Sequence, residues 1–333
     1  MKAIIKSLRR NPLVAAALYS VARPLYYGAE RLHFRIGRHV HRNGGTAEYD
    51  GIPLRFPRNV GIGFLAAISW RGVEGFEPET WKTLRRLIET SNTFLDIGAN
   101  IGLYSVLAKR VSPSIDVISF EPMPAIAAQS RAFHMANAIA PSVEEIGLSD
   151  SDGEARLFTP HGEETSSSTL SSVSWQARNP HEEFTVRTAK LDSYLSGRRL
   201  REPVTIKIDV EDHEAAVLRG ATETIRHYRP AIVCEILPRA ITRDNQPGGE
   251  PARPGEQHEN AATLQVLADI GYTAFAITAD GYFRMTAADF KGDRSFRDCL
   301  LLPDEDIDQG RNYFAGLPMR HPRRQDKGTP SIG

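Results

Sequence analysis

The most regular feature of the chain is an alternation of short apolar runs with longer amphipathic segments between residues 93 and 302. The short runs are rich in β-branched side chains and end at polar or glycine residues, which predicts buried strands. The longer segments place apolar residues three and four positions apart, which predicts helices. Strands are predicted at 94–97, 115–120, 143–147, 204–208, 231–236, 272–277 and 297–302, and helices at 101–111, 124–138, 214–228 and 260–270. This order predicts an α/β fold, with a mostly parallel sheet between two layers of helices.

Further elements are predicted around this alternating region. The pattern indicates a hairpin at 46–56, a helix at 78–90, an extra hairpin strand at 154–158, a strand at 184–188, and polar loops at 160–183 and 238–258. The first hairpin is centred on Asp50-Gly51, a dipeptide that favours tight turns. Pro78 occupies the first position of the helix, where its missing N–H costs nothing. The two loops are long for a compact domain, which is typical of loops with a functional role.

The two ends of the chain differ from the region between them. Residues 1–45 hold nine Lys or Arg and one acid, Glu30, and favour a basic amphipathic helix. We expect it to pack on the domain, and peripheral contact with an anionic membrane is the alternative. The polar C-terminal end is expected to be disordered. The chain therefore divides into a basic helical N-terminal extension (1–50), one domain (51–305) and a polar tail (306–333).

The composition is that of a globular enzyme with a sizeable core. Hydrophobic residues make up 41% and charged residues 25% of the 333 residues, as in ordinary globular domains. The 41 Lys and Arg balance the 41 Asp and Glu, so no net field favours binding to nucleic acid. Cys234 and Cys299 lie in apolar runs and are interpreted as buried free thiols, which favours a cytoplasmic protein.

One stretch, Thr93 to Tyr104, combines a strand, a glycine turn and the start of a helix. Its turn region holds Asp96, Gly98, Asn100 and Gly102. Glycines let a backbone turn sharply and approach a ligand closely, and a helix that begins after such a turn can bind a nucleotide. An acid beside the turn would repel a pyrophosphate but attract an ammonium or sulfonium group. The stretch therefore favours S-adenosylmethionine over a dinucleotide.

Candidate ligand-binding residues also follow the next two predicted strands. Ligands of parallel sheets bind at the carboxyl ends of the strands. Glu121 follows the second strand, where a carboxylate can accept hydrogen bonds from both ribose hydroxyls. Asp150 follows the third strand and is a candidate for binding the adenine amino group. A turn-forming role before Ser151 is the alternative for Asp150.

The end of the fourth predicted strand carries the densest group of ionisable residues. Asp209 ends the strand, and Glu211 and His213 follow on the turn into the next helix. Crowding of this kind shifts pKa values and can supply a general base, so these three are the candidate catalytic residues. Acids that stabilise the start of the helix are the alternative. With Glu235 the group would also suit Mg²⁺ or Mn²⁺, but no spacing requires a divalent metal and none is predicted.

Six motifs along the chain resemble the FkbM family of S-adenosylmethionine-dependent methyltransferases: FLDIGANIGLYS, ISFEP, GLSDSDG, TAKLDSYL, VTIKIDVEDHEAAVLRGA and RPAIVCEI. The resemblance spans about residues 55–302. It implies a Rossmann-like class I methyltransferase fold, with a seven-stranded sheet whose last strand is antiparallel. It also implies methyl transfer to a hydroxyl of a sugar or small molecule. The family usually has Gly where this chain has Asp212, which leaves the acceptor open.

The same resemblance implies roles for particular residues. It assigns the donor site to Asp96, Gly98, Asn100, Gly102 and Glu121, and a donor- or acceptor-facing role to Asp209 and Glu211.

The sequence thus predicts a methyltransferase that uses S-adenosylmethionine to methylate a hydroxyl oxygen of a glycan or small metabolite. A nicotinamide-dependent oxidoreductase and a non-catalytic donor-binding module are the alternatives. Asn100 and Leu103 stand where the dinucleotide motif GxGxxG, counted from Gly98, has its later glycines, which disfavours the oxidoreductase. The acids after the fourth strand disfavour the non-catalytic module. The acceptor and the oligomeric state are not determined by the sequence.

Overall fold

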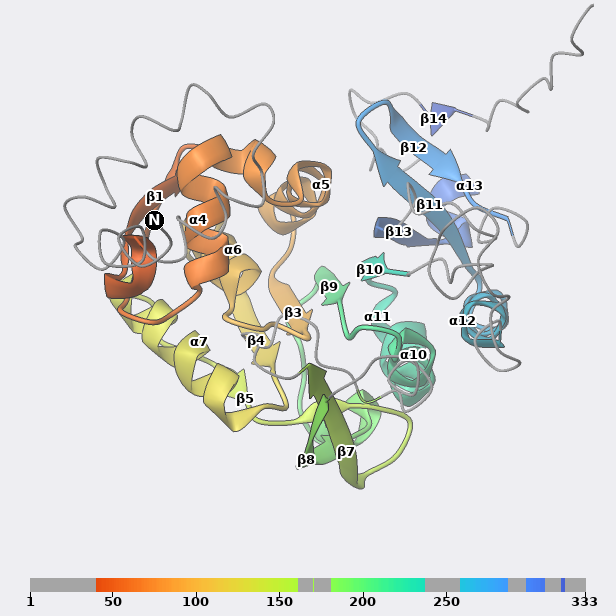
Figure 1. Ribbon diagram of the computed structural model, residues 1–333. Helices are drawn as coiled ribbons and strands as arrows, with labels where there is room; N and C mark the ends of the chain where they lie inside the picture. Colours follow the sequence, from red (N-terminus) through yellow and green to blue (C-terminus); the bar gives the residue numbers. More distant parts are fainter. Residues whose placement is uncertain are drawn as a thin grey trace, which may run out of the picture.

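A mixed sheet of nine strands forms the centre of the part of the chain that the structure describes (Figure 1). The structure is a computed structural model, and it describes residues 40–160, 170, 181–236, 258–286, 298–308 and 319–320. The strand order is β14-β12-β11-β13-β10-β9-β3-β4-β5. In chain order these strands are β3 (Thr93–Ile97), β4 (Asp116–Phe120), β5 (Val143–Glu144), β9 (Val204–Ile208), β10 (Ala231–Glu235), β11 (Tyr272–Thr278), β12 (Gly281–Arg284), β13 (Asp298–Pro303) and β14 (Met319–Arg320).

The strand directions confirm the predicted α/β fold with a mainly parallel sheet. Strands β5, β4, β3, β9 and β10 are mutually parallel. Strand β13, the last of the seven predicted strands, lies between β10 and β11 and is antiparallel to both. The described sheet has nine strands instead of seven because β12 and β14 extend its edge beyond β11.

The three central strands are buried along their whole length. A strand covered on both faces needs apolar side chains at successive positions, and β3, β9 and β10 are mostly apolar for this reason. Their charged residues, Asp96, Lys207 and Glu235, are therefore buried as well. Burial of a charge is costly unless the charge is paired, so these three side chains mark a region of the sheet where polar groups converge.

Helices cover both faces of the sheet (Figure 1). The first face carries α4 (Ile62–Arg71), α5 (Pro78–Glu89), α6 (Leu103–Val111) and α7 (Pro124–Ala136), and the second carries α9 (Leu191–Tyr194), α10 (Glu214–Gly220), α11 (Thr222–Tyr228) and α12 (His258–Asp269). Adjacent strand residues point to opposite faces. Phe94 accordingly packs in the first core, with Trp81 of α5, and Leu95 packs in the second core, with Leu218 of α10.

The predicted helix at 214–228 is divided into α10 and α11. Ala221 leaves helical geometry between them, with φ −113° and ψ 9°. Gly220, at the end of α10, passes close to the carbonyl oxygen of Ser149, and a β-carbon on residue 220 would lie 1.9 Å from that oxygen. The break between α10 and α11 and the close approach of Gly220 to Ser149 both lie where α10 meets the segment that follows β5.

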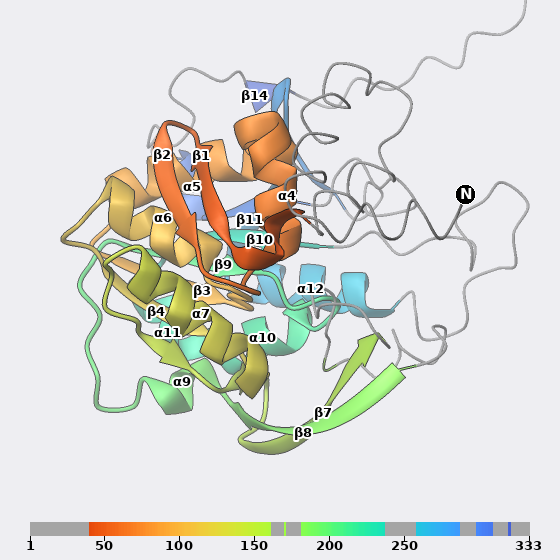
Figure 2. The same ribbon diagram turned by 60° about the vertical axis from the view of Figure 1, so that its left-hand side comes forward.

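Two hairpins flank the sheet. Strands β1 (Gly45–Tyr49) and β2 (Ile52–Phe56) confirm the first predicted hairpin, and both turn residues, Asp50 and Gly51, have positive φ, as a tight two-residue turn requires. The second hairpin pairs β7 (Gly153–Pro160) with β8 (His181–Ala189), and β6 (Gly147–Leu148) adds a third strand. The run predicted as one strand at 143–147 is thus shared between β5 and β6. Figures 1 and 2 both show the second hairpin at the lower edge of the molecule, away from α4 and α5.

The ends of the chain are described only in part. The predicted helical extension lies mostly outside the described residues, which begin with a short 3₁₀ turn at His41–Asn43 and then strand β1. Helix α13 (Asp304–Asp308) crosses the predicted boundary between the domain and the tail, and the tail that was expected to be disordered also contains strand β14. The predicted loops at 160–183 and 238–258 fall largely outside the described residues. None of the described helices has the length and apolar character needed to cross a bilayer.

Candidate active site

A cavity of about 160 Å³ opens at the carboxyl ends of β3, β4, β9 and β10. A single water molecule needs only ~10–15 Å³ on this measure, so the cavity has room for a substantial part of an organic ligand. Its described lining residues are Phe64, Phe76, Glu77, Ile97–Ile101, Leu103, Tyr104, Phe120–Pro122, Ile146–Leu148, Leu157, Leu170, Lys207, Asp209–Glu211 and Glu235. The cavity therefore lies where ligands of parallel sheets bind.

The glycine turn after β3 forms one wall of the cavity. Gly98 and Gly102 have φ of 76° and 78°, which is the left-handed region that glycine adopts at little cost. A β-carbon on Gly98 would lie 1.8 Å from the carbonyl oxygen of Asp209, and one on Gly102 would lie 2.5 Å from the ring of His134 on α7. Both glycines are thus needed for close packing within the protein. Gly98 also lines the cavity, whereas Gly102 lies outside its lining.

Glu121 connects the end of β4 to this turn. Its two carboxylate oxygens accept hydrogen bonds from the backbone amides of Asn100 at 3.0 Å and Met123 at 2.9 Å. The side chain is buried, and burial raises the pKa of Glu121 to about 7 although both amide hydrogen bonds lower it. Asn100 has a φ of 51°, and this conformation points its amide at the carboxylate. The pair places a carboxylate at the position predicted for a ribose contact.

Asp96 lies behind the turn instead of in the cavity wall. Its side chain is 1% exposed, and Oδ2 accepts a hydrogen bond from the Ser105 hydroxyl at 2.6 Å. No donor among the described residues reaches the buried Oδ1. Burial raises the pKa of Asp96, while the nearby ammonium group of Lys207 lowers it. Asp96 therefore lies close enough to add its charge to the site, and its hydrogen bond to Ser105 links β3 to α6.

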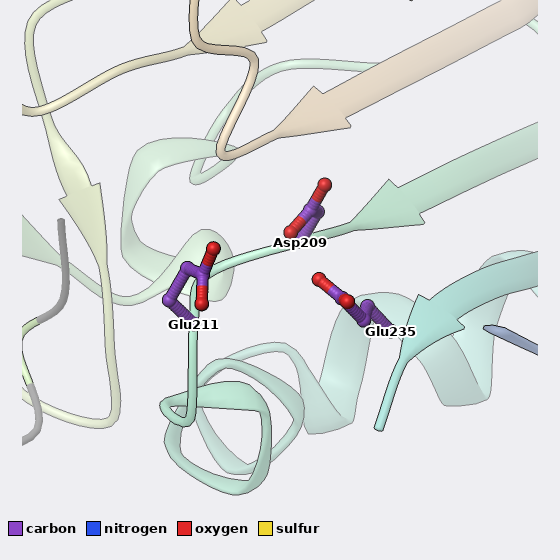
Figure 3. Close-up of side chains that lie close together, drawn as sticks. All are labelled: Asp209, Glu211 and Glu235. Atoms are coloured by element: carbon purple, nitrogen blue, oxygen red, sulfur yellow. The ribbon is translucent and has the colours of Figure 1, made fainter. Parts of the chain in front are cut away.

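Three carboxylates converge at the ends of β9 and β10. Figure 3 shows Asp209, Glu211 and Glu235 pointing toward one another, and one oxygen atom of each lies within 4.8 Å of the others. The buried Lys207 donates a hydrogen bond from Nζ to Asp209 at 2.7 Å. Burial lowers the pKa of Lys207, but the carboxylates around it raise the pKa above its ordinary value. The cluster has the oxygen ligands that Mg²⁺ prefers, but Lys207 already neutralises part of its charge, so the geometry alone assigns no metal to it.

His213 and Asp150 lie outside the lining of the cavity. The Nε2 atom of His213 is 2.9 Å from the hydroxyl oxygen of Ser149, and burial lowers the pKa of His213 to about 4. Asp150 accepts two hydrogen bonds from the guanidinium group of Arg219, at 2.7 and 3.0 Å. Both side chains therefore hold the junction between the segment after β5 and helix α10.

The structure thus brings five of the nine predicted site residues to the cavity. These are Gly98, Asn100, Glu121, Asp209 and Glu211, while Asp96, Gly102, Asp150 and His213 lie outside its lining. Asp212, where the resembling family usually has Gly, has a φ of 77°. This is a conformation that favours glycine, and an aspartate is among the side chains that tolerate it best.

Three charged residues of the cavity wall, Glu77, Lys207 and Glu235, are not among the nine predicted site residues. Lys207 interrupts an apolar strand, and a buried charge in such a strand is a signal of a polar partner nearby. Glu77 precedes the proline that begins α5, and nothing in its local pattern separates it from a surface glutamate. Only the packing of α5 and α6 shows that it faces the site.

Comparison with known proteins identifies the family of this chain. The family model of the methyltransferase FkbM domain matches residues 96–274, more than half of the chain. The chain therefore belongs to the FkbM methyltransferase family. No curated protein matches the chain.

Several solved structures of methyltransferases are more distantly similar. The methyltransferase FkbM from Methylobacillus flagellatus KT is 15% identical, over 74% of this chain and 56% of that chain, with a TM-score of 0.35. The O-methyltransferase from Bacillus cereus in complex with SAH is 14% identical, over 67% of this chain and 78% of that chain, with a TM-score of 0.37. This chain spans little more than half the length of the Methylobacillus protein. The family assignment rests on the family model alone.

Proposed function

We propose that the protein transfers a methyl group from S-adenosylmethionine to a hydroxyl oxygen of a glycan or small metabolite. The charge of the cavity is the observation that carries this proposal. Its described lining contains one lysine, Lys207, and five acids: Glu77, Glu121, Asp209, Glu211 and Glu235. Such an excess of carboxylates attracts the sulfonium and ammonium groups of the methyl donor and repels a pyrophosphate.

The other parts of the donor also find suitable groups in the cavity. A carboxylate can accept about four hydrogen bonds, and the described amides occupy two such positions on Glu121. Two positions therefore remain for the ribose hydroxyls. The lining also contains the apolar side chains of Leu148, Leu157 and Leu170, which suit the flat face of an adenine ring.

The remaining part of the cavity supports a hydroxylated acceptor. Phe64, Phe76 and Tyr104 line it together with the carboxylates, and the rings of Phe64 and Phe76 pack edge to face at 4.7 Å. Aromatic faces pack against the apolar faces of sugar rings, and carboxylates accept hydrogen bonds from hydroxyl groups. This combination favours a sugar or another polyol over an apolar acceptor.

The two alternatives make different predictions for ligand binding. A nicotinamide-dependent oxidoreductase would place a pyrophosphate beside Glu121 and Asp209, where like charges repel it. A non-catalytic module would bind the donor without transferring its methyl group. Two carboxylates of the cavity, Glu77 and Glu121, favour an enzyme, because burial raises the pKa of each to about 7 and proton transfer uses groups with such perturbed pKa values.

Calorimetric titration of the full chain with S-adenosylmethionine, its demethylated product S-adenosylhomocysteine and NAD separates these possibilities. We expect both sulfur compounds to bind and NAD not to bind. Binding of NAD alone would overturn the proposal. Mass spectrometry of a cell glycan and lipid extract incubated with isotope-labelled donor then identifies the acceptor, and donor binding without transfer to any acceptor would support the non-catalytic module.

A cytoplasmic location is part of this proposal. Cys234 and Cys299 are free, buried thiols that lie opposite each other on β10 and β13. Two thiols left unlinked in neighbouring strands suit a reducing compartment. Peripheral membrane contact through the basic N-terminal segment stays a prediction, because that segment lies outside the described residues.

A further inference from the structure

Glu77 has an unusual backbone conformation at the edge of the cavity. Its φ of 39° and ψ of 55° are left-handed, and Pro78 follows it as the first residue of α5. A residue before proline is disfavoured in the right-handed helical region, and a non-glycine residue in the left-handed region costs ~1–2 kcal/mol. Strain of this kind is concentrated at functional sites. As N-cap of α5, Glu77 makes no capping hydrogen bond with its side chain, so the carboxylate serves another purpose.

The carboxylate of Glu77 is held by a tyrosine and faces the cavity. The Tyr104 hydroxyl donates a hydrogen bond to Oε2 at 2.6 Å. The Tyr104 ring is itself fixed, because it stacks on Trp81 at 6.3 Å and lies 4.9 Å from Nζ of Lys207. Among the described residues, the Tyr104 hydroxyl is the one hydrogen-bond donor to this carboxylate, and it engages Oε2. Oε1 is therefore left without a hydrogen-bond donor among the described residues, and Glu77 is one of the residues that line the cavity.

Ionisable groups from four neighbouring elements interact electrostatically with Glu77. They are Lys207 and Asp209 at the end of β9, Asp298 at the start of β13, Tyr104 on α6 and Tyr49 on β1. Burial, Asp209 and Asp298 raise the pKa of Glu77, Lys207 and the Tyr104 hydrogen bond lower it, and the net result is a pKa of about 7. A carboxylate with a pKa near neutrality can accept a proton and release it again at physiological pH.

Three of the other candidate bases are less well placed for proton transfer. Asp209 already holds the Lys207 ammonium group in an ion pair at 2.7 Å. Both oxygens of Glu121 accept backbone amides. His213 lies outside the cavity lining. Glu77 combines access to the cavity with an oxygen that is not committed to an internal ion pair.

We propose that Glu77 is the catalytic base that takes the proton from the acceptor hydroxyl. This inference rests on the proposed function. As the acceptor oxygen forms its bond to the methyl carbon, the proton moves from that oxygen to Oε1 of Glu77. The electron pair of the broken carbon–sulfur bond stays on sulfur, so that a sulfonium becomes a neutral thioether. A base that is hydrogen-bonded to an oxygen in line with the methyl group must lie close to the sulfonium charge.

Binding of the donor and of its product therefore tests the position of Glu77 without any acceptor. S-adenosylmethionine carries the sulfonium charge and S-adenosylhomocysteine does not, so only the former gains from ionisation of Glu77. The ratio of the dissociation constants, S-adenosylhomocysteine over S-adenosylmethionine, should rise by about threefold to tenfold between pH 6 and pH 8. Glu121 also titrates in this range, but it faces the ribose, which both compounds share, so its effect cancels in the ratio.

Three variants sharpen this experiment. Glu77→Gln should abolish the rise of the ratio, and Glu79→Gln, a change on the same helix where Glu79 pairs with the exposed Lys82, should preserve it. Tyr104→Phe removes a hydrogen bond that lowers the pKa of Glu77, so the rise should move to higher pH. A ratio that does not change with pH in the wild type, or that rises equally in Glu77→Gln, would overturn the inference.

Transfer of the labelled methyl group to the glycan and lipid extract tests the catalytic step itself. Loss of a general base lowers the rate by roughly 10²–10⁴-fold, so Glu77→Gln should lose at least 100-fold while still binding S-adenosylhomocysteine like the wild type. Equal rates in Glu77→Gln and the wild type would refute a catalytic role for Glu77 and leave the methyltransferase assignment intact. Failure of the wild type to bind either sulfur compound would instead refute the proposed function.

Discussion

A β-carbon on Gly98 would lie 1.8 Å from the carbonyl oxygen of Asp209. The turn after β3 and the end of β9 are further joined by a hydrogen bond from the Asp209 amide to the carbonyl oxygen of Ile97 at 3.0 Å. The glycine turn after β3 and the cluster of carboxylates are therefore packed directly against each other. Residue 98 can only be glycine without a shift of one of these two segments.

Gly98→Ala is expected to lower the free energy of unfolding by more than ~3 kcal/mol, because it adds a backbone clash to the strain of a positive φ. Gly51→Ala is the matched control, since Gly51 has a φ of 75° and a β-carbon added there would have no atom within 4 Å. It should cost only the strain, ~1–2 kcal/mol. Urea unfolding of both variants measures the difference, and equal losses would contradict a clash at Asp209.

Glu121→Ala is expected to weaken the binding of S-adenosylmethionine by about 10- to 100-fold, which corresponds to ~1–3 kcal/mol for the lost hydrogen bonds. It also leaves the amides of Asn100 and Met123 without their acceptor. Glu145→Ala is the control, because Glu145 forms a surface ion pair with Arg131. Calorimetry measures both constants, and unchanged binding in Glu121→Ala would remove Glu121 from the donor site.

The pH dependence of stability should report the burial of His213. Its pKa falls from about 6.5 in the unfolded chain to about 4 in the folded protein. As the pH falls, the unfolded state takes up this proton first, so the folded state loses stability between pH 6.5 and pH 4. The wild type should lose ~3 kcal/mol more than His213→Gln by pH 4.

Urea unfolding at pH 7, 5.5 and 4 checks this expectation. Glu77 and Glu121 titrate in the opposite direction, because their raised pKa values favour proton uptake by the folded state. The comparison with His213→Gln cancels their contribution. His227→Gln, at an exposed histidine of α11, is the control and should follow the wild type. Parallel curves for the wild type and His213→Gln would contradict the burial of a neutral imidazole.

Asp212→Gly is expected to stabilise the protein by ~1 kcal/mol, because it relieves a left-handed conformation at a residue with a side chain. It also removes a negative charge that raises the pKa of the buried Glu214. Asp280→Gly is the control, because Asp280 is exposed and does not have a positive φ. Thermal unfolding should show a higher midpoint for Asp212→Gly alone, and a lower midpoint would show that the interactions of Asp212 stabilise the protein by more than the strain costs.

The elements of the fold could be predicted from the chain because their patterns are local. The strands at 94–97, 204–208 and 231–236 have apolar runs that only a strand covered on both faces requires. The division of 214–228 into two helices could not be predicted in this way. It occurs where Gly220 meets Ser149, and the two residues are 71 positions apart in the sequence.

The site residues also divide into those that a local pattern could place and those that it could not. Glu121 could be placed because an acid at the end of the second strand is next to the turn in any sheet of this order. The prediction that Asp96 faces the donor came from its position beside the glycines. A strand residue can point to either face, and packing against Ser105 on α6 turned this side chain away from the cavity wall.

The amino-acid sequence was sufficient to predict the parallel sheet, the glycine turn and the presence of acids at the strand ends, because each depends on neighbouring residues and on the periodicity of helices and strands. The tertiary structure decided which acids reach the cavity. It placed Glu77 beside Lys207 and Tyr104, and it bound His213 to Ser149 outside the cavity lining. These choices depend on contacts between segments that are distant along the chain, and no local pattern specifies the distance between such segments.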